Sequence, residues 1–237
     1  MKTTQRRVAV ILARPENPEN IGLVARAMKN TGFSDLRLAG VRRLGSKAYK
    51  TAVHAAEVLD RAGRFPDTES AAADCDVVFA GTAKPRKNVG LIPLVEAVAM
   101  IRSFPAATRV GLLFGNERTG LTSDELLHAN FVFTIPQASR QPSYNLSSAV
   151  LLTLYALFAA GEPPIASGRE RPLPRREQEA AIGLILEKLA SKGFVYGTNR
   201  VHVTEMMHDL FGRLAMTDKD RRLLLAIFTK GVDDRHP

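Results

Sequence analysis

The stretch RVGLLFGNERTGL, residues 109–121, joins an apolar run to a turn that carries an acid and a base. The run RVGLLF has the length and apolar content of a strand that is buried on both faces of a sheet. Gly115 and Gly120 enclose the turn, and glycine permits backbone angles that other residues avoid. The main chain of such a turn can approach a ligand closely. We therefore expect a binding role near Glu117 and Arg118, with a surface ion pair of little consequence as the alternative.

Further apolar runs of strand length alternate with helical segments along the chain. Strands are predicted at residues 7–13, 35–40, 76–81, 109–115 and 131–136. Helices are predicted at residues 21–32, 51–62, 93–104, 122–129 and 145–161, and residues 41–50 are predicted to form a loop. This pattern indicates a parallel sheet whose two faces are covered by helices. Ligands of such sheets bind beyond the carboxyl ends of the strands, where the loops 14–20, 114–121 and 136–145 are expected.

The chain of 237 residues is long enough for one α/β domain with a small appendage. The composition changes at residues 161–177, where four prolines and several arginines indicate a linker. We predict a main domain over residues 1–161, a Pro/Arg-rich linker over 162–174 and a helical C-terminal extension over 175–237. Thr217 and Asp220 are expected to cap the last helix of this extension.

The composition points to a cytoplasmic protein with a polyanionic partner. No apolar run reaches the roughly 18 residues that a membrane span needs, and the N-terminus lacks the features of a signal peptide. Lys and Arg outnumber Asp and Glu by 33 to 24, which gives a net charge of +9 and makes nucleic acid the first candidate partner. The absence of tryptophan and the aromatic content of 6% argue against recognition of single strands by base stacking.

The segment ARPENPENIGLVARAMKNTG, residues 13–32, would end the first strand and begin the first long helix. Asn20 stands directly before the expected helix and is interpreted as its cap. Gly22 and Arg26 lie one turn apart on one stripe of this helix. The missing side chain at Gly22 predicts space for a ligand beside the helix start, and an arginine next to that space suits a phosphate. The alternative for Arg26 is a solvated side chain.

The segment IPQASRQPSYNLSSAVLL, residues 135–152, leads from the last strand into a very apolar helix. Four polar residues crowd the start of this helix: Ser143, Asn145, Ser147 and Ser148. One such residue is enough to cap a helix. The excess predicts polar contacts at the floor of a pocket.

Common chemical motifs are absent from the sequence. It contains no G-x-x-x-x-G-K-[ST] loop, no G-x-G-x-x-G after the first strand, no H-E-x-x-H and no G-x-S-x-G. Five scattered histidines do not have the spacing of metal ligands, so we expect no metal site. The single cysteine, Cys75, excludes an intrachain disulfide and is expected to be a small buried residue.

Three segments together resemble a known family. NIGLVARAMKNTG (20–32), LLFGNERTGL (112–121) and IPQASRQPSYNLSSAVLLTLYAL (135–157) are similar, in order and spacing, to the three motifs of the SpoU branch of the SPOUT RNA methyltransferases. The resemblance covers about residues 7–160 and is greatest to the TrmJ subgroup, which methylates the ribose 2′-hydroxyl of cytidine or uridine at position 32 of the tRNA anticodon loop. It implies a parallel sheet with a C-terminal trefoil knot, a homodimer and S-adenosylmethionine as cofactor.

The resemblance also implies roles for individual residues. The RNA and the chemistry would involve Asn20, Arg26, Glu117, Ser143 and Asn145. The cofactor would contact Leu113, Phe114, Gly115, Ile135, Pro136, Asn145, Leu146 and Ser147. An arginine essentially never loses its proton in a protein, so we interpret Arg26 as a group that stabilises the developing alkoxide. Glu117 would orient Arg26 or Asn20.

Three basic segments are candidates for contacts with RNA phosphates, with solvated charge as the alternative for each. They are Arg42–Lys50, Lys84–Lys87 and Arg169–Arg176. Two other functions remain open at this point. One is the same reaction on ribosomal RNA, and the other is RNA binding by a relative that has lost catalysis.

Overall fold

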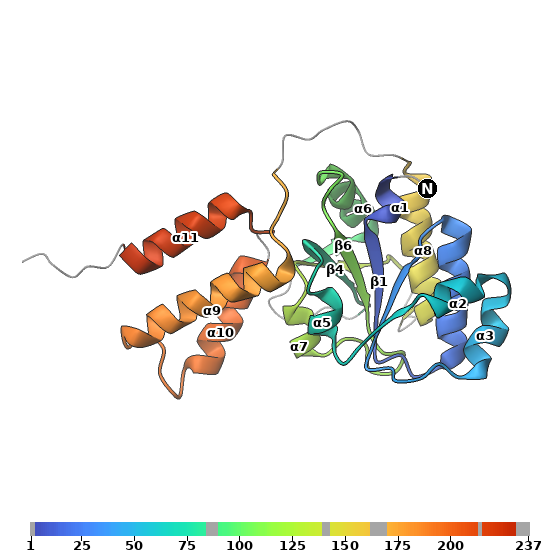
Figure 1. The fold of residues 1–237 in the computed structure, drawn as a ribbon, viewed down its shortest axis with the longest axis horizontal. Coiled ribbons are helices and arrows are strands. Elements are labelled where there is room, and N and C mark those ends of the chain that lie inside the picture. The colour runs from blue at the N-terminus through green and yellow to red at the C-terminus, as the bar shows by residue number, and fades with distance from the viewer. Residues whose placement is uncertain (1–2, 84–89, 139–142, 162–169, 213–214, 231–237) are drawn as a thin grey trace, which may run out of the picture.

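A parallel sheet of seven strands lies at the centre of the computed structural model (Figure 1), which describes residues 3–83, 90–138, 143–161, 170–212 and 215–230. The strands follow the order β3-β2-β1-β6-β4-β7-β5, and every neighbouring pair is parallel. They are β1 (Val8–Ala13), β2 (Asp35–Ala39), β3 (Gly63–Phe65), β4 (Val77–Gly81), β5 (Leu91–Pro93), β6 (Val110–Phe114) and β7 (Phe131–Thr134). The predicted parallel α/β architecture is confirmed, and the trefoil knot stays a prediction.

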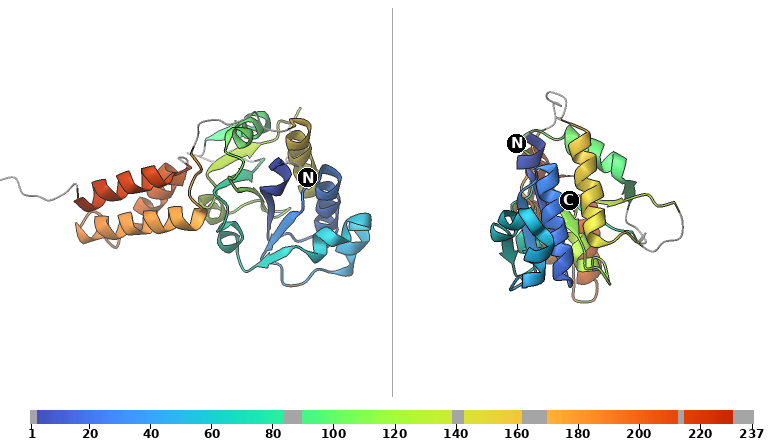
Figure 2. Two further views of the ribbon diagram at one scale, coloured as in Figure 1. Left: turned by 45° about the horizontal axis from the view of Figure 1, so that its top comes forward. Right: turned by 90° about the vertical axis from the view of Figure 1, so that its right-hand side faces the viewer.

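Helices cover both faces of this sheet (Figures 1 and 2). They are α1 (Thr3–Arg6), α2 (Pro18–Thr31), α3 (Ser46–Ala52), the 3-10 turn η1 (Val53–Ala55), α4 (Ala56–Asp60), α5 (Thr68–Ala72), α6 (Leu94–Ser103), α7 (Ser123–Leu127) and α8 (Leu146–Ala159). The larger core lies under α2, α3, α4, α6 and α8, and a smaller core lies under α5 and α7. Phe114 faces the larger core and Leu113 the smaller one, which explains why the strands are apolar throughout.

Several short elements lie outside the sequence-based prediction. Residues 46–50, predicted as part of a loop, belong to α3, because Ala48 and Ala52 are buried against neighbouring elements, chiefly α2. The strands β3 and β5 and the helix α5 have only three to five residues each. Such segments are too short to show a periodic pattern. Pairing with β2 and β7 at the edges of the sheet stabilises the two strands.

Gly22 marks a close contact between α2 and α3. A Cβ atom at this position would come within 2.1 Å of the carbonyl oxygen of Ala48 and of the hydroxyl of Thr51. The hydroxyl of Thr51 donates a hydrogen bond to the carbonyl oxygen of Glu19 at 3.0 Å. The prediction of ligand space beside Gly22 is therefore wrong, because α3 fills that space.

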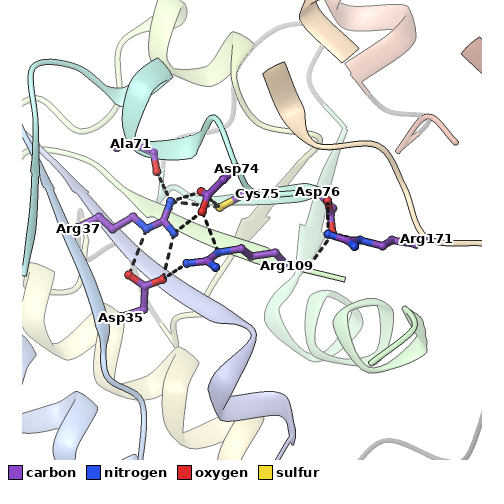
Figure 3. Close-up of polar contacts among 8 residues, drawn as sticks. All are labelled: Asp35, Arg37, Ala71, Asp74, Cys75, Asp76, Arg109 and Arg171. Atoms are coloured by element: carbon purple, nitrogen blue, oxygen red, sulfur yellow. Dashed lines mark hydrogen bonds and ion pairs between the residues drawn. The ribbon is translucent and has the colours of Figure 1, made fainter. Parts of the chain in front are cut away.

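The amino ends of the strands carry a network of ion pairs (Figure 3). The buried guanidinium of Arg37 binds the carboxylate of Asp35, at 3.0 Å, and that of Asp74. Arg109 contacts the same two carboxylates at 2.7 Å and 3.1 Å. Cys75 lies buried beside this network, and burial raises the pKa of its thiol to about 12. The expectation that Cys75 is a small buried residue is confirmed.

The C-terminal extension docks at this amino edge of the sheet. It consists of α9 (Arg175–Ser191), α10 (Arg200–Gly212) and α11 (Asp218–Lys230), which share an apolar core of their own. The carboxylate of Asp76, just before β4, accepts a hydrogen bond from Arg171 Nε at 2.8 Å, and its carbonyl accepts one from Gln178 Nε2 at 2.9 Å. Thr217 and Asp220 form the predicted cap of α11. The division into a main domain, a linker and an extension at residues 161 and 174 stays a prediction.

None of the helices formed by the described residues combines the length and apolar character needed to cross a membrane.

We expect Gly22→Ala to destabilise the fold by about 1–3 kcal/mol, because the new methyl group must push α3 away from α2. Gly183→Ala is the matched control, since Gly183 lies on the exposed side of α9 and a Cβ atom there would meet nothing within 4 Å. The helix propensity of alanine predicts a gain of roughly 1 kcal/mol for this control. Urea unfolding followed by circular dichroism measures both changes. Equal stability of the two variants would contradict the close packing at Gly22.

Candidate active site

Three loop segments lie side by side at the carboxyl ends of the strands. β1 and β6 are neighbours in the sheet, with Leu12 opposite Phe114, so the segments that follow them leave from the same edge. The start of α8 reaches this edge because α8 packs against α2, and Figure 2 shows the two helices side by side. The predicted loops 14–20, 114–121 and 136–145 therefore meet, except for residues 139–142, which lie outside the described residues.

The carboxylate of Glu117 connects the turn after β6 to the beginning of α2. It accepts hydrogen bonds from the backbone amides of Glu16, at 2.9 Å, and Asn17, at 3.2 Å. A third hydrogen bond comes from the side-chain amide of Asn20 at 2.9 Å. Burial opposes ionisation of Glu117, but these three donors outweigh it and lower the pKa of the carboxyl. Glu117 is therefore ionised at neutral pH.

Asn20 lies within α2 and not at its N-cap. The helix begins at Pro18, and the side chain of Asn17 caps it by accepting a hydrogen bond from the amide of Glu19. The interpretation of Asn20 as the cap is therefore wrong. Asn20 is 5% exposed, and its amide spans two loops: Nδ2 donates to Glu117, and Oδ1 accepts a hydrogen bond from Asn145 Nδ2 at 3.1 Å.

Asn145 completes a hydrogen-bonded chain across all three segments. Its side chain is the N-cap of α8, where Oδ1 accepts from the amide of Ser147 at 2.9 Å and from the hydroxyl of the same residue at 2.7 Å. Its Nδ2 is thereby directed toward Asn20. Glu117, Asn20 and Asn145 therefore form one connected group, which we call the Glu117–Asn20–Asn145 chain.

A pocket opens beside the turn that carries Glu117. Its empty volume is about 850 Å³, part of which is open to solvent. Four of the residues expected to contact a cofactor line it, namely Phe114, Gly115, Ile135 and Leu146. Ser143 and Glu117 also line it, which places two of the expected catalytic residues at its wall.

The other expected cofactor contacts lie behind or beside this wall. Leu113 is fully buried in the smaller core, on the opposite side of β6 from Phe114. The carbonyl of Pro136 accepts a hydrogen bond from the hydroxyl of Tyr144 at 3.3 Å. Asn145 and Ser147 bond to each other at the start of α8.

The end of β4 also lines the pocket, and the sequence analysis missed it. Gly81, Thr82 and Ala83 face the turn after β6 because β4 lies between β6 and β7 in the sheet. The available signal was a run of three small residues that begins with the last residue of the strand predicted at 76–81. Its importance depends on the sheet order, which local sequence patterns do not show.

Arg26 lies apart from this group within the chain. It is an exposed residue of α2, and among the described residues no hydrogen bond or ion pair involves its guanidinium. It lies six positions after Asn20, which corresponds to about 9 Å along the helix axis. Glu117 therefore contacts Asn20. Among the described residues, the structure shows no contact between Glu117 and Arg26.

The three basic segments differ in what they contact. Residues Arg42–Lys50 follow β2 at the same edge as the pocket. In Arg169–Arg176, Arg171 binds Asp76, and the buried Arg175 donates to the carbonyl of Leu127 at 2.6 Å, so these two arginines hold the C-terminal extension. Lys84–Lys87 lies outside the described residues.

Comparison with known proteins places these features in context. The chain matches the SpoU rRNA Methylase family over residues 7–155. The tRNA (cytidine/uridine/adenosine-2′-O-)-methyltransferase TrmJ of Pseudomonas aeruginosa is 30% identical over 239 residues, which cover 94% of this chain and 93% of that protein. The crystal structure of TrmJ from Z. mobilis ZM4 has a TM-score of 0.81 and 31% identity, covering 94% of this chain and 97% of the other. The AdoMet complex of the SpoU methyltransferase AviRb from Streptomyces viridochromogenes shares the fold, with a TM-score of 0.50 and 23% identity over 64% of this chain and 57% of that chain.

The lowered pKa of Glu117 predicts a pH-dependent contribution to stability. Such a carboxylate stabilises the fold fully above its unfolded pKa, about 4.3 for glutamate, and the contribution is lost as the pH falls through the folded pKa. Glu117→Gln should lose about 1–3 kcal/mol at pH 7, because the charged acceptor is lost and one of its two oxygens becomes an amide nitrogen, which cannot accept a hydrogen bond. The difference from wild type should shrink below about pH 4. Urea unfolding of wild type and Glu117→Gln at several pH values between about 4 and 7 measures this difference in stability. The exposed Glu187→Gln is the control. A difference that does not change with pH would contradict the role of the charge.

Proposed function

The chain belongs to the SpoU rRNA methylase family, and we propose that it transfers a methyl group from S-adenosylmethionine to the ribose 2′-hydroxyl of cytidine or uridine at position 32 of the tRNA anticodon loop. The observation that carries the proposal is the Glu117–Asn20–Asn145 chain at the edge of an open pocket. The choice of tRNA is supported by the P. aeruginosa relative, whose name gives tRNA as its substrate and which aligns with 94% of this chain. A reaction on tRNA implies the cytoplasm as the site of action.

The residues around the pocket fit S-adenosylmethionine. A Cβ atom on Gly115 would lie 2.3 Å from the carbonyl carbon of Gly120, so only glycine lets the turn fold back this tightly and present its main chain. Phe114, Ile135 and Leu146 supply apolar walls. When bound, the cofactor supplies a methyl group on a sulfonium, which is already activated for transfer.

The chain's own residues then have to align a weak nucleophile and manage one proton. Glu117 accepts three hydrogen bonds from the protein and has a lowered pKa, so it is a poor general base and acts by holding Asn20 in place. Ser143 and Asn145 lie where the ribose would enter, at the pocket wall and at the start of α8. Arg26 would stabilise the developing alkoxide and bind the neighbouring phosphate.

A homodimer is part of the proposal, and two observations support it. An exposed apolar stripe runs along α8, and its members are Leu151, Leu152, Tyr155 and Phe158. A second copy that covered this stripe would remove apolar surface from water. α8 packs against α2, which carries Arg26 on its exposed side, so the same second copy could offer partners to Arg26, whose guanidinium makes no hydrogen bond or ion pair with the described part of its own chain.

Methyl transfer from labelled S-adenosylmethionine to separate tRNA and rRNA fractions, followed by nucleoside analysis, tests the proposed function. We expect label in 2′-O-methylcytidine or 2′-O-methyluridine from tRNA. Label in rRNA alone would support the proposed reaction and contradict tRNA as its substrate. No transfer to either RNA, together with no binding of S-adenosylmethionine by calorimetry, would contradict catalysis and favour an RNA-binding relative.

Arg26→Lys is the matched variant in this assay, because it keeps the charge and loses the planar fork of the guanidinium. Removing one preorganised donor from a developing oxyanion costs about 100–1,000-fold in turnover, and we expect a loss of that order. Affinity for S-adenosylmethionine should stay close to wild type. Near-normal turnover would contradict the proposal that the planar guanidinium of Arg26 stabilises the developing alkoxide.

The residues after β2 are suited to bind RNA next to the site. Arg42, Arg43, Lys47 and Lys50 are exposed, and we call them the β2 basic group. The ammonium of Lys47 lies 4.0 Å from the carboxylate of Glu19 in the first turn of α2, and Glu19 directly precedes Asn20 of the Glu117–Asn20–Asn145 chain.

The double variant Arg42→Gln/Arg43→Gln should bind tRNA more weakly and depend less on salt. Loss of two phosphate contacts reduces the slope of log K against log salt by about 1–2. The control is Lys188→Gln/Arg200→Gln, which removes two exposed cations from the C-terminal extension and leaves the β2 basic group intact. Filter binding at several salt concentrations measures both slopes, and a larger effect in the control would move the RNA surface to the extension.

A further inference from the structure

Arg14 is the first residue after β1, and its backbone has an unusual conformation. Its φ angle is +50°, in the left-handed region that residues other than glycine seldom adopt. Its amide donates to the carbonyl of Ala39 at 2.9 Å, which fixes it beside the end of β2. Such a conformation persists only where the surrounding structure holds it. The contacts of Arg14 therefore show which segments depend on it.

The guanidinium of Arg14 forms a two-pronged ion pair with Glu125. Nε lies 2.7 Å from Oε1, and Nη2 lies 2.8 Å from Oε2, a geometry that adds specificity to the attraction. Glu125 is buried, and its carboxylate also accepts a hydrogen bond from the amide of Thr122 at 2.7 Å. Thr122 and Glu125 form the predicted capping box at the start of α7. Arg14 therefore ties the end of β1 to α7, across the turn after β6.

The carbonyl of Arg14 holds the turn itself. It accepts a hydrogen bond from Asn116 Nδ2 at 2.8 Å. Asn116 Oδ1 accepts from the backbone amides of Arg118, at 2.9 Å, and Thr119, at 3.1 Å, and the turn closes with a bond from the amide of Gly120 to the carbonyl of Asn116. Asn116 is 5% exposed, so the shape of the turn depends on the acceptor that Arg14 supplies.

Glu117, in the same turn, contacts the chain just beyond Arg14. Its carboxylate accepts hydrogen bonds from the amides of Glu16 and Asn17. Arg14 and Glu117 therefore both connect the segment after β1 to the turn after β6. We propose that Arg14 is a positioning residue that fixes the orientation of Glu117, and through it that of Asn20, beside the pocket. Its effect on turnover rests on the proposed methyl transfer, while its effect on the turn does not.

Two variants of Arg14 test its side chain, because both keep the backbone carbonyl that accepts from Asn116. Arg14→Gly removes the guanidinium and adopts the left-handed conformation without strain, whereas Arg14→Lys keeps the charge and loses the two-pronged geometry. The control is Arg222→Gln, which removes an exposed ion pair with Asp218 on α11. We expect kcat of Arg14→Gly to fall about 10–100-fold with the KM for tRNA within about two-fold of wild type, since misplacement of about 1 Å affects the chemical step. Arg14→Lys should recover part of this loss, and the control should match wild type.

Amide hydrogen exchange supplies a measurement that does not depend on turnover. In Arg14→Gly the amides of Glu16, Asn17 and Arg118 should exchange about ten-fold faster or more, with unchanged protection in α9. Normal kcat per folded molecule with unchanged exchange at these amides would overturn the proposal, and so would reduced stability alone with normal kcat. A wild-type protein that transfers no methyl group would contradict the proposed function only, because exchange would still show whether Arg14 holds the turn.

Discussion

The carboxylate of Glu117 joins two loops of the candidate site into one structure. Pairing of β1 with β6 brings the loops to the same edge of the sheet, but it does not fix the side chains that they carry. The amides just before α2 have no partner within the helix, and Glu117 accepts two of them close to the positive end of the helix dipole. The same carboxylate fixes Asn20, and Asn20 fixes Asn145, so the orientation of all three depends on this contact.

Charged residues have different roles at the amino ends and at the carboxyl ends of the strands. At the amino edge, Arg37, Arg109 and Arg171 bind carboxylates and hold the strands and the C-terminal extension. At the carboxyl ends of the strands, the β2 basic group is exposed, and its Lys47 lies 4.0 Å from Glu19, the residue before Asn20. The net charge of +9 therefore overstates the number of cations that are exposed and able to contact RNA, because several arginines bind carboxylates within the protein. This separation also keeps the extension, which docks at Asp76, on the edge opposite to the pocket.

The sequence predicts the elements that are long and continuously apolar, because a strand buried on both faces and an amphipathic helix each leave a periodic signal. It does not predict which segments become neighbours. Asn20 resembles a cap because it precedes the apolar pattern, yet Asn17 and Pro18 form the actual helix start, a pairing that cap preferences favour. Gly22 predicts space for a ligand beside the helix start, but α3, which is too short to recognise from its sequence, fills that space. The pocket wall formed after β4 depends on the order of strands in the sheet.

A double-mutant cycle between Glu117→Gln and Asn145→Ala tests most directly whether the site acts as one connected unit. The two side chains do not bond to each other, and Asn20 links them. The measurement is kcat/KM for methyl transfer to tRNA by wild type, both single variants and the double variant. A connected chain predicts that the double variant loses little more activity than the worse single variant, because either change already releases Asn20. Losses that multiply independently would contradict the chain as the basis of the site.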